Sequence, residues 1–181
     1  LDTLAKSLAD DLGDNVIKCD SCDIRDMTVN ELLELGNILL VFSGGPRDRA
    51  NGIFKWGYGG DTDYYLSDNY SNSEEFYHMK DDQYDKMRKK SNHEHGKDFL
   101  LSWTLTLSTV DAVGCFSMPH TSILNLAYKA TPRLFDFIQR WERNENITKT
   151  YFPNVLYVDA VTGTAASAAI YLNTVYDDIK E

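Results

Sequence analysis

Apolar side chains recur in this chain at helical spacing in some segments and form unbroken runs in others. The first twelve residues place apolar side chains on one helical face, at Leu1, Leu4, Ala5, Leu8 and Leu12. Gly13 follows this pattern and is a typical helix stop. Thr28 precedes a second, shorter apolar pattern, and Glu31 stands three residues after it. This spacing predicts a capping box and a short helix that ends before Gly36.

Three mostly apolar segments predict strands that are buried on both faces, as in a parallel sheet: residues 37–43, 98–107 and 154–161. A weaker strand is expected within residues 14–27, whereas the stretch 44–72 has no clear period and is expected to be a long loop. Further helices are predicted over three segments: 74–90, 122–141 with a break at Pro132, and 164–179. Strands that alternate with helices indicate an α/β fold with a parallel sheet, in a single domain over residues 1–181.

Composition narrows the classes of protein that remain. With 43% hydrophobic and 12% aromatic residues, the 181-residue chain can bury a core, which excludes wholesale disorder. Its formal net charge of -10 argues against binding nucleic acid or an anionic membrane surface through the overall field. No apolar run reaches the roughly 18 residues of a membrane-spanning helix, so no transmembrane segment is expected. No signal peptide pattern opens the chain, and because Leu1 lies inside a helical pattern we expect a further segment upstream.

Cysteines and sequons bear on the compartment in which the protein works. Cys19 and Cys22 have C-x-x-C spacing, and Cys115 makes the number odd. The spacing is compatible with a disulfide, with free thiols, or with a redox or metal site, although zinc would need two further ligands at knuckle spacing that the sequence lacks. We favour a disulfide between Cys19 and Cys22. Two N-glycosylation sequons, at Asn69 and Asn146, also favour a secreted, extracellular glycoprotein.

Several segments together carry a resemblance to a known family. Residues 28–33 (TVNELL) are followed by 37–44 (NILLVFSG), and later segments read FLLSWTLT at 99–106 and PNVLYVD at 153–159. In this order and at these separations they resemble the X domain of phosphatidylinositol-specific phospholipase C, in its secreted and bacterial-type members. The resemblance implies a β/α barrel of the triosephosphate isomerase (TIM) type. This chain would be its C-terminal half, because a closed barrel needs about 250 residues.

The resemblance also implies an activity. The family's general base and general acid are two histidines in the N-terminal half of the barrel, so the catalytic residues are expected outside this chain. The chain would be part of a secreted phosphodiesterase that cleaves a phosphodiester of a phosphoinositide or a related lipid. Its expected partner is the N-terminal half of the same barrel, or a second chain that supplies that half.

Substrate contacts are expected at the carboxyl ends of the strands and in the loops that follow, where β/α barrels carry their chemistry. Trp103 and Asp159 stand at such places; alternatively, Trp103 packs in the core and Asp159 makes structural hydrogen bonds. Lys55 and Tyr58 lie in the glycine-spaced aromatic segment 52–60, which is suited to a phosphate or a lipid face, or is a packed surface loop. We expect these four residues to converge on one substrate-binding site.

Two departures from the family's pattern support a second interpretation. Matched to the family, Val41 stands near the place of an arginine, and Ala160 replaces the aromatic residue that follows the last-strand aspartate in many members. A chain without these contacts fits a non-catalytic binding or defence protein on the same scaffold. A small flavodoxin-like binding domain is a third interpretation, although no glycine-rich phosphate loop follows the first strand.

Metal-binding motifs are weak in this sequence. The HEH run at residues 93–95 lies among polar residues typical of a solvated loop. The DTD run at residues 61–63 opens like a calcium loop, but Tyr65 and Leu66 occupy the next ligand and glycine positions. We therefore expect no metal site and no cofactor, and a Ca²⁺ site has no further support in the sequence.

Overall fold

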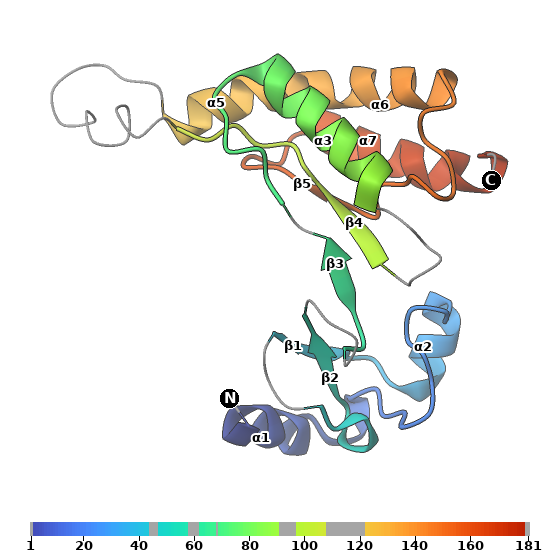
Figure 1. Ribbon diagram of the computed structural model, residues 1–181. Coiled ribbons are helices and arrows are strands. Elements are labelled where there is room, and N and C mark those ends of the chain that lie inside the picture. Colours follow the sequence, from blue (N-terminus) through green and yellow to red (C-terminus); the bar gives the residue numbers. More distant parts are fainter. Residues whose placement is uncertain are drawn as a thin grey trace, which may run out of the picture. The chain divides into compact units, whose positions relative to one another are not determined.

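The computed structural model describes residues 2–43, 47–57, 62–67, 69–90, 97–107 and 122–179. The chain divides into two compact units, Leu1–Leu66 and Ser67–Glu181, and each unit has a hydrophobic core of its own. Figure 1 shows the helices and strands of both units in chain order. None of the described helices is long and apolar enough to cross a membrane.

The first unit is built around two parallel strands and the helices beside them. Its elements are α1 (Asp2–Leu12), η1 (Gly13–Asn15), α2 (Val29–Leu35), β1 (Leu40–Ser43), η2 (Arg49–Asn51) and β2 (Ile53–Trp56). β1 and β2 run parallel, with Leu40 opposite Ile53. Helix α1 packs on the strands because its Ala5 and Ala9 are buried against Ile53. The helix predicted over the first twelve residues is therefore confirmed, but of its predicted apolar face Ala5 is buried whereas Leu4 is exposed.

Helix α2 begins and ends as the sequence predicts. Thr28 Oγ1 accepts a hydrogen bond from the Glu31 N–H at 3.3 Å, and Glu31 Oε2 accepts one from the Thr28 N–H at 2.7 Å. These two bonds form the predicted capping box. After the helix, Gly36 passes so close to the backbone of Val16 that a Cβ would lie 2.8 Å from the Val16 carbonyl carbon. Close packing therefore requires glycine where the helix ends.

Strand β2 lies in the stretch 44–72, which the sequence pattern predicted to be loop. The strand has four residues, and Gly52 precedes it with a left-handed φ of 79°. A Cβ at Gly52 would meet the Val16 side chain well inside van der Waals distance, so the chain turns into the strand at a point that only glycine fits. The short strand β3 (Tyr65–Ser67) also lies in the predicted loop. Conversely, the weak strand expected within 14–27 is reduced to an isolated bridge from Val16 to Ile38.

The second unit combines a parallel strand pair with helices. Its elements are α3 (Phe76–Lys90), β4 (Lys97–Ser102), α5 (Ile123–Ala130), η4 (Thr131–Arg133), α6 (Leu134–Arg143), β5 (Val155–Tyr157), α7 (Gly163–Val175) and η5 (Tyr176–Asp178). β4 and β5 run parallel, with Ser102 opposite Tyr157 at their carboxyl ends. Figure 1 shows α3, α6 and α7 beside this pair, and all three helices contribute buried side chains to one core.

That core is rich in aromatic side chains. Trp103 is 1% exposed, and its ring lies 5.6, 5.8 and 5.9 Å from the rings of Phe76, Phe137 and Trp141, measured between centroids. The indole Nε1 of Trp103 donates a hydrogen bond of 2.9 Å to the carbonyl of Ala130. The one polar atom of the ring is thus paired inside the core, as a buried tryptophan requires.

The helix predicted over residues 122–141 is broken at Pro132, as expected. Helix α5 ends at Ala130, one 3-10 turn (η4) contains the proline, and α6 starts at Leu134. Proline lacks an N–H and its ring clashes with the preceding turn, so the α-helix cannot continue through it. At the other end Ser122 caps α5 by accepting a hydrogen bond from the Asn125 N–H at 3.1 Å.

These elements form a mixed α/β protein with parallel strand pairs, which confirms the predicted α/β class. Over the described residues the strands do not close into a barrel. The finer assignment, half of a TIM-type barrel, stays a prediction of the family resemblance.

Candidate functional site

A cavity of about 530 Å³ opens at the carboxyl ends of β4 and β5. We call it the strand-end pocket. Its apolar lining residues, which we call the apolar wall, are Leu100, Leu105, Leu107 and Ile123. Its polar lining residues, which we call the polar wall, are Tyr70, Ser102, Thr104, Thr106, Tyr157 and Asp159. None of these residues carries a positive charge. Ligands of α/β proteins commonly bind at this end of parallel strands.

The strand register brings the polar groups together. Ser102 pairs with Tyr157, and the Trp103 N–H donates to the Tyr157 carbonyl at 2.9 Å, so the strand ladder ends at the pocket. Side chains of an extended chain alternate between its two faces. Ser102 and Thr104 therefore share one side, with their hydroxyl oxygens 3.2 Å apart, while Trp103 between them faces the core.

Asp159 is the acidic residue of the strand-end pocket and lies two residues beyond β5. The residue as a whole is exposed, but partial burial of its carboxyl removes water and raises the pKa of Asp159 above its ordinary value. Within the described part of the chain, no hydrogen bond or ion pair engages this carboxylate. Its oxygens can therefore accept hydrogen bonds from a ligand.

The predicted substrate-contact residues do not all share this pocket. Asp159 lines it. Trp103 lies in the hydrophobic core instead, which agrees with the alternative that this residue packs rather than contacts substrate. Lys55 belongs to β2 in the first unit, and its N–H donates to Asp63 Oδ2 at 2.7 Å. Tyr58 lies outside the described residues. The convergence of Lys55 and Tyr58 with Asp159 on one site stays a prediction.

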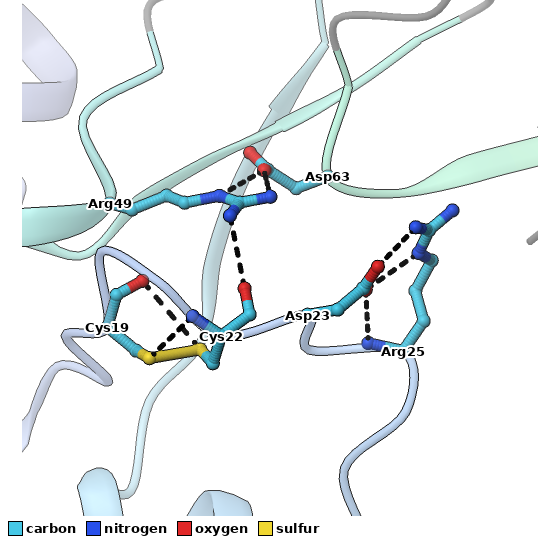
Figure 2. The surroundings of a disulfide bond; sticks show 6 residues. All are labelled: Cys19, Cys22, Asp23, Arg25, Arg49 and Asp63. Atoms are coloured by element: carbon cyan, nitrogen blue, oxygen red, sulfur yellow. Dashed lines mark hydrogen bonds and ion pairs between the residues drawn. A yellow bond between two sulfur atoms is a disulfide. The ribbon is translucent and has the colours of Figure 1, made fainter.

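A polar cluster in the first unit surrounds Cys19 and Cys22, as Figure 2 shows. The two sulfur atoms lie at bonding distance, in agreement with the predicted disulfide. Arg49 is tied to both ends of this loop: its Nη1 donates to the Cys22 carbonyl at 3.1 Å, and its carbonyl accepts from the Cys19 N–H at 3.1 Å. Beside it, hydrogen bonds from Arg25 lower the pKa of Asp23 to about 2. Cys115 lies outside the described residues.

Arg49 also holds the buried carboxylate of Asp63. The Asp63 side chain is 0% exposed; it pairs with Arg47 Nε at 2.9 Å and with Arg49. Figure 2 shows Arg49 between Cys22 and Asp63. Sequence reasoning considered Asp63 only as part of a calcium-loop opening, because its arginine partners stand 14 and 16 residues away and no local pattern links them. The cluster is a structural ion pair that joins the disulfide loop to β2.

A second cavity, of about 550 Å³, lies in the first unit, and we call it the apolar hollow. It is lined by Ile24, Leu39, Val41, Trp56, Tyr64 and Leu66. Val41, which stands near the place of the family's arginine, is 39% exposed on its wall. The hollow therefore offers apolar contact and no charged group among its lining residues.

The remaining predicted motifs are the two glycosylation sequons and the HEH run. Asn69 is exposed, whereas Asn146 is partly buried and its Oδ1 accepts a hydrogen bond from the Tyr84 hydroxyl at 2.7 Å. Glycosylation at either sequon stays a prediction. The HEH run at residues 93–95 lies outside the described residues, and the part of the chain that is described holds no group of three His, Cys, Asp or Glu side chains placed to bind a metal ion.

Comparison with known proteins leaves the argument to this geometry. No protein-family model, curated protein or solved structure matches the chain. The strand-end pocket places a carboxylate, several hydroxyl groups and apolar contact at the carboxyl ends of two parallel strands, and it is the candidate functional site.

Proposed function

We propose that the chain is the substrate-binding part of a secreted phospholipase C-like phosphodiesterase, and that the strand-end pocket receives the polyol ring of the substrate. One observation carries the proposal: a 530 Å³ cavity at the carboxyl ends of β4 and β5 places a carboxylate and several hydroxyl groups against an apolar wall. Cavities of about 300 to 1,000 Å³ are typical of small-molecule sites.

The chemistry of the wall favours a polyol ring over a phosphate group. Asp159 accepts hydrogen bonds, and the hydroxyls of Ser102, Thr104 and Tyr157 both donate and accept them. A cyclic polyol presents hydroxyls at its edge and C–H groups on its face, so its edge suits the polar wall and its face suits Leu100 and neighbouring apolar groups. A phosphate beside Asp159 would meet like charge with no cation among the described lining residues.

The family resemblance assigns catalysis and substrate binding to different halves of the barrel. The general base and general acid for attack on phosphorus are two histidines that the N-terminal half of the barrel supplies, from the same precursor or a second chain. Asp159 then binds and orients the polyol ring of the substrate, whereas the histidines carry out the proton transfers. Lys55 and Tyr58 are proposed to contact the phosphate or the lipid, with Lys55 as a point charge.

A secreted location is supported by two independent features. The Cys19–Cys22 pair lies at disulfide distance, which is usual for proteins of oxidising compartments. The sequence also has two N-glycosylation sequons, at Asn69 and Asn146.

The alternative function is a non-catalytic binding protein on the same scaffold, and Val41 is the observation that favours it. Val41 lines the apolar hollow near the place where the family has an arginine, so that position offers no charge to a phosphate. In this alternative the strand-end pocket still binds a polyol, but addition of the N-terminal half restores no phosphodiesterase activity.

Calorimetric titration of the 181-residue chain tests the proposed site, with myo-inositol and myo-inositol 1-phosphate as probes. We expect saturable binding of both, and we expect Asp159→Asn to weaken it by about 10-fold or more, because a hydrogen bond to a charged group contributes roughly 1.5–3 kcal/mol. The matched control is Asp136→Asn, the same substitution on the exposed face of α6. Absence of binding, or equal affinities for the two variants, would contradict the proposal.

A further inference from the structure

Helix α3 carries a buried amide that is bonded both to the segment 69–71 and to the end of β4, and each of these contributes a residue to the strand-end pocket. Gln83 is 0% exposed. Its Nε2 donates to the Asn69 carbonyl at 2.9 Å and to Ser71 Oγ at 3.0 Å, and its Oε1 accepts from the Ser102 N–H at 3.0 Å. Both ends of the amide are therefore paired, which a buried polar group requires.

The groups that Gln83 joins are far apart in sequence but both belong to the pocket. Ser102 is the last residue of β4 and lines the polar wall. Asn69 and Ser71 flank Tyr70, which lines the same pocket and is 57% exposed. The Tyr70 backbone carbonyl also accepts a hydrogen bond from Lys86 Nζ at 3.2 Å, one turn further along α3. Hydrogen bonds to α3 thus hold the backbone of the segment that carries Tyr70, although Tyr70 itself is largely exposed.

We propose that Gln83 is the positioning residue of the strand-end pocket: one buried amide fixes the segment 69–71 relative to the end of β4, and so holds Tyr70 over the ligand. This inference rests on the proposed function of the pocket as a polyol site. An amide suits the task because it offers two N–H donors and an acceptor in one rigid plane. A methionine of similar length would fill the space and make none of these bonds.

The contribution to binding comes from preorganisation. A ligand that must order the segment 69–71 itself loses part of its affinity, whereas a wall that is already fixed avoids that loss. Paired polar networks inside a core also restrict it to one arrangement. Gln83 therefore acts on the ligand through Tyr70, whose segment it ties to the end of β4, without touching the ligand itself.

A double-mutant cycle tests this route of action, with myo-inositol as the probe and the 181-residue chain as the protein. We expect Gln83→Met and Tyr70→Ala each to weaken binding by about 10-fold, and the double variant to be no weaker than the weaker single variant, because the two residues act as one unit. Met87→Ala is the control for lost stability: it truncates another fully buried side chain of α3 that takes no part in the hydrogen bonds of the Gln83 side-chain amide. This variant should leave the affinity unchanged. Unchanged affinity in Gln83→Met, or effects that multiply in the double variant, would overturn the proposal.

Amide exchange followed by NMR separates this inference from the proposed function, because it needs no ligand. The Ser102 N–H should exchange slowly in the wild type and faster in Gln83→Met, which loses the bond to it. In Ser71→Ala the Ser102 N–H should still exchange slowly. The Tyr70 ring resonances should change in both variants, because each variant loses the bond between Gln83 and Ser71. If Ser102 exchange and the Tyr70 resonances are the same in all three proteins, Gln83 does not position the wall. If they change as expected and myo-inositol does not bind, the positioning role holds and the proposed ligand is wrong.

Discussion

Replacing Asp63 by asparagine should destabilise the first unit more than any other single change of charge that we consider. The Asp63 carboxylate is 0% exposed, accepts the Lys55 N–H at 2.7 Å and pairs with Arg47 and Arg49. The substitution keeps an oxygen for the Lys55 N–H. It removes the negative charge and turns an NH₂ group toward two guanidinium groups that can only donate.

The magnitude follows from how much water reaches the arginines. Breaking a fully buried ion pair costs about 3–5 kcal/mol. Arg47 and Arg49 retain 34% and 18% of their side-chain exposure, so water partly solvates them once the carboxylate is gone. We therefore expect the free energy of unfolding to fall by about 2–3 kcal/mol. For a unit of this size, that loss corresponds to a thermal unfolding midpoint that is lower by roughly 10 °C or more.

Hydrogen exchange with mass spectrometry over a urea series measures this loss, because it reports peptides of the first unit separately from those of the second. The control is Asp14→Asn. Asp14 also faces a cation, Lys18 at 3.7 Å, but its side chain is fully exposed and its ion pair is screened by water, so its loss should leave the free energy of unfolding almost unchanged. If Asp63→Asn were no more destabilising than Asp14→Asn, the buried cluster would not stabilise the first unit and our account of it would be refuted.

Three smaller predictions follow from local contacts. Thr28→Ala removes half of the capping box and should lower the free energy of unfolding by about 1 kcal/mol in urea titrations; no change would mean that α2 does not depend on its cap. Thiol titration of the denatured, unreduced chain should find one free thiol at most, since three cysteines less the bonded pair Cys19 and Cys22 leave one; three free thiols would refute the disulfide. The pKa of Asp159 is raised by folding, so the folded chain holds this proton more tightly, and the associated stability is present at low pH and lost as the pH rises from 3.8 through the raised value. Asp159→Asn should therefore reduce the downward slope of stability with pH in that window, and an unchanged slope would show that folding does not desolvate the carboxyl.

The sequence predicted those elements whose determinants are local. The capping box at Thr28 depends on residues three apart, and the break at Pro132 depends on one residue. The cores of β1, β4 and β5 lie within the three predicted strands. The expectation that all three are buried on both faces is wrong, because β1 alternates between partly buried and exposed residues and Tyr157 of β5 is exposed. β4 is shorter than the predicted run 98–107, since it ends where its partner β5 ends, and a single sequence does not reveal that length.

Features that depend on distant partners could not be predicted in this way. β2 has four residues between two glycines and reads as a loop until β1 pairs with it. For Trp103, which directly follows β4, the sequence left a substrate contact and core packing open, and its ring partners from other elements place it in the core. Gln83 was not considered, because its partners lie 12 to 19 residues away on other elements and nothing near it in sequence distinguishes it from an exposed helix residue.

The central claim is that the strand-end pocket, and not the apolar hollow, is the ligand site of this chain. Backbone NMR of the 181-residue chain during a myo-inositol titration tests it most directly. We predict saturable shifts of the amide resonances of Ser102, Thr104 and Asp159, and in Asp159→Asn we expect the shifts of Ser102 and Thr104 to need about ten times more ligand, or more, to reach saturation. Shifts confined to Leu39 and Val41 in the apolar hollow, or no saturable shift in either cavity, would contradict the account.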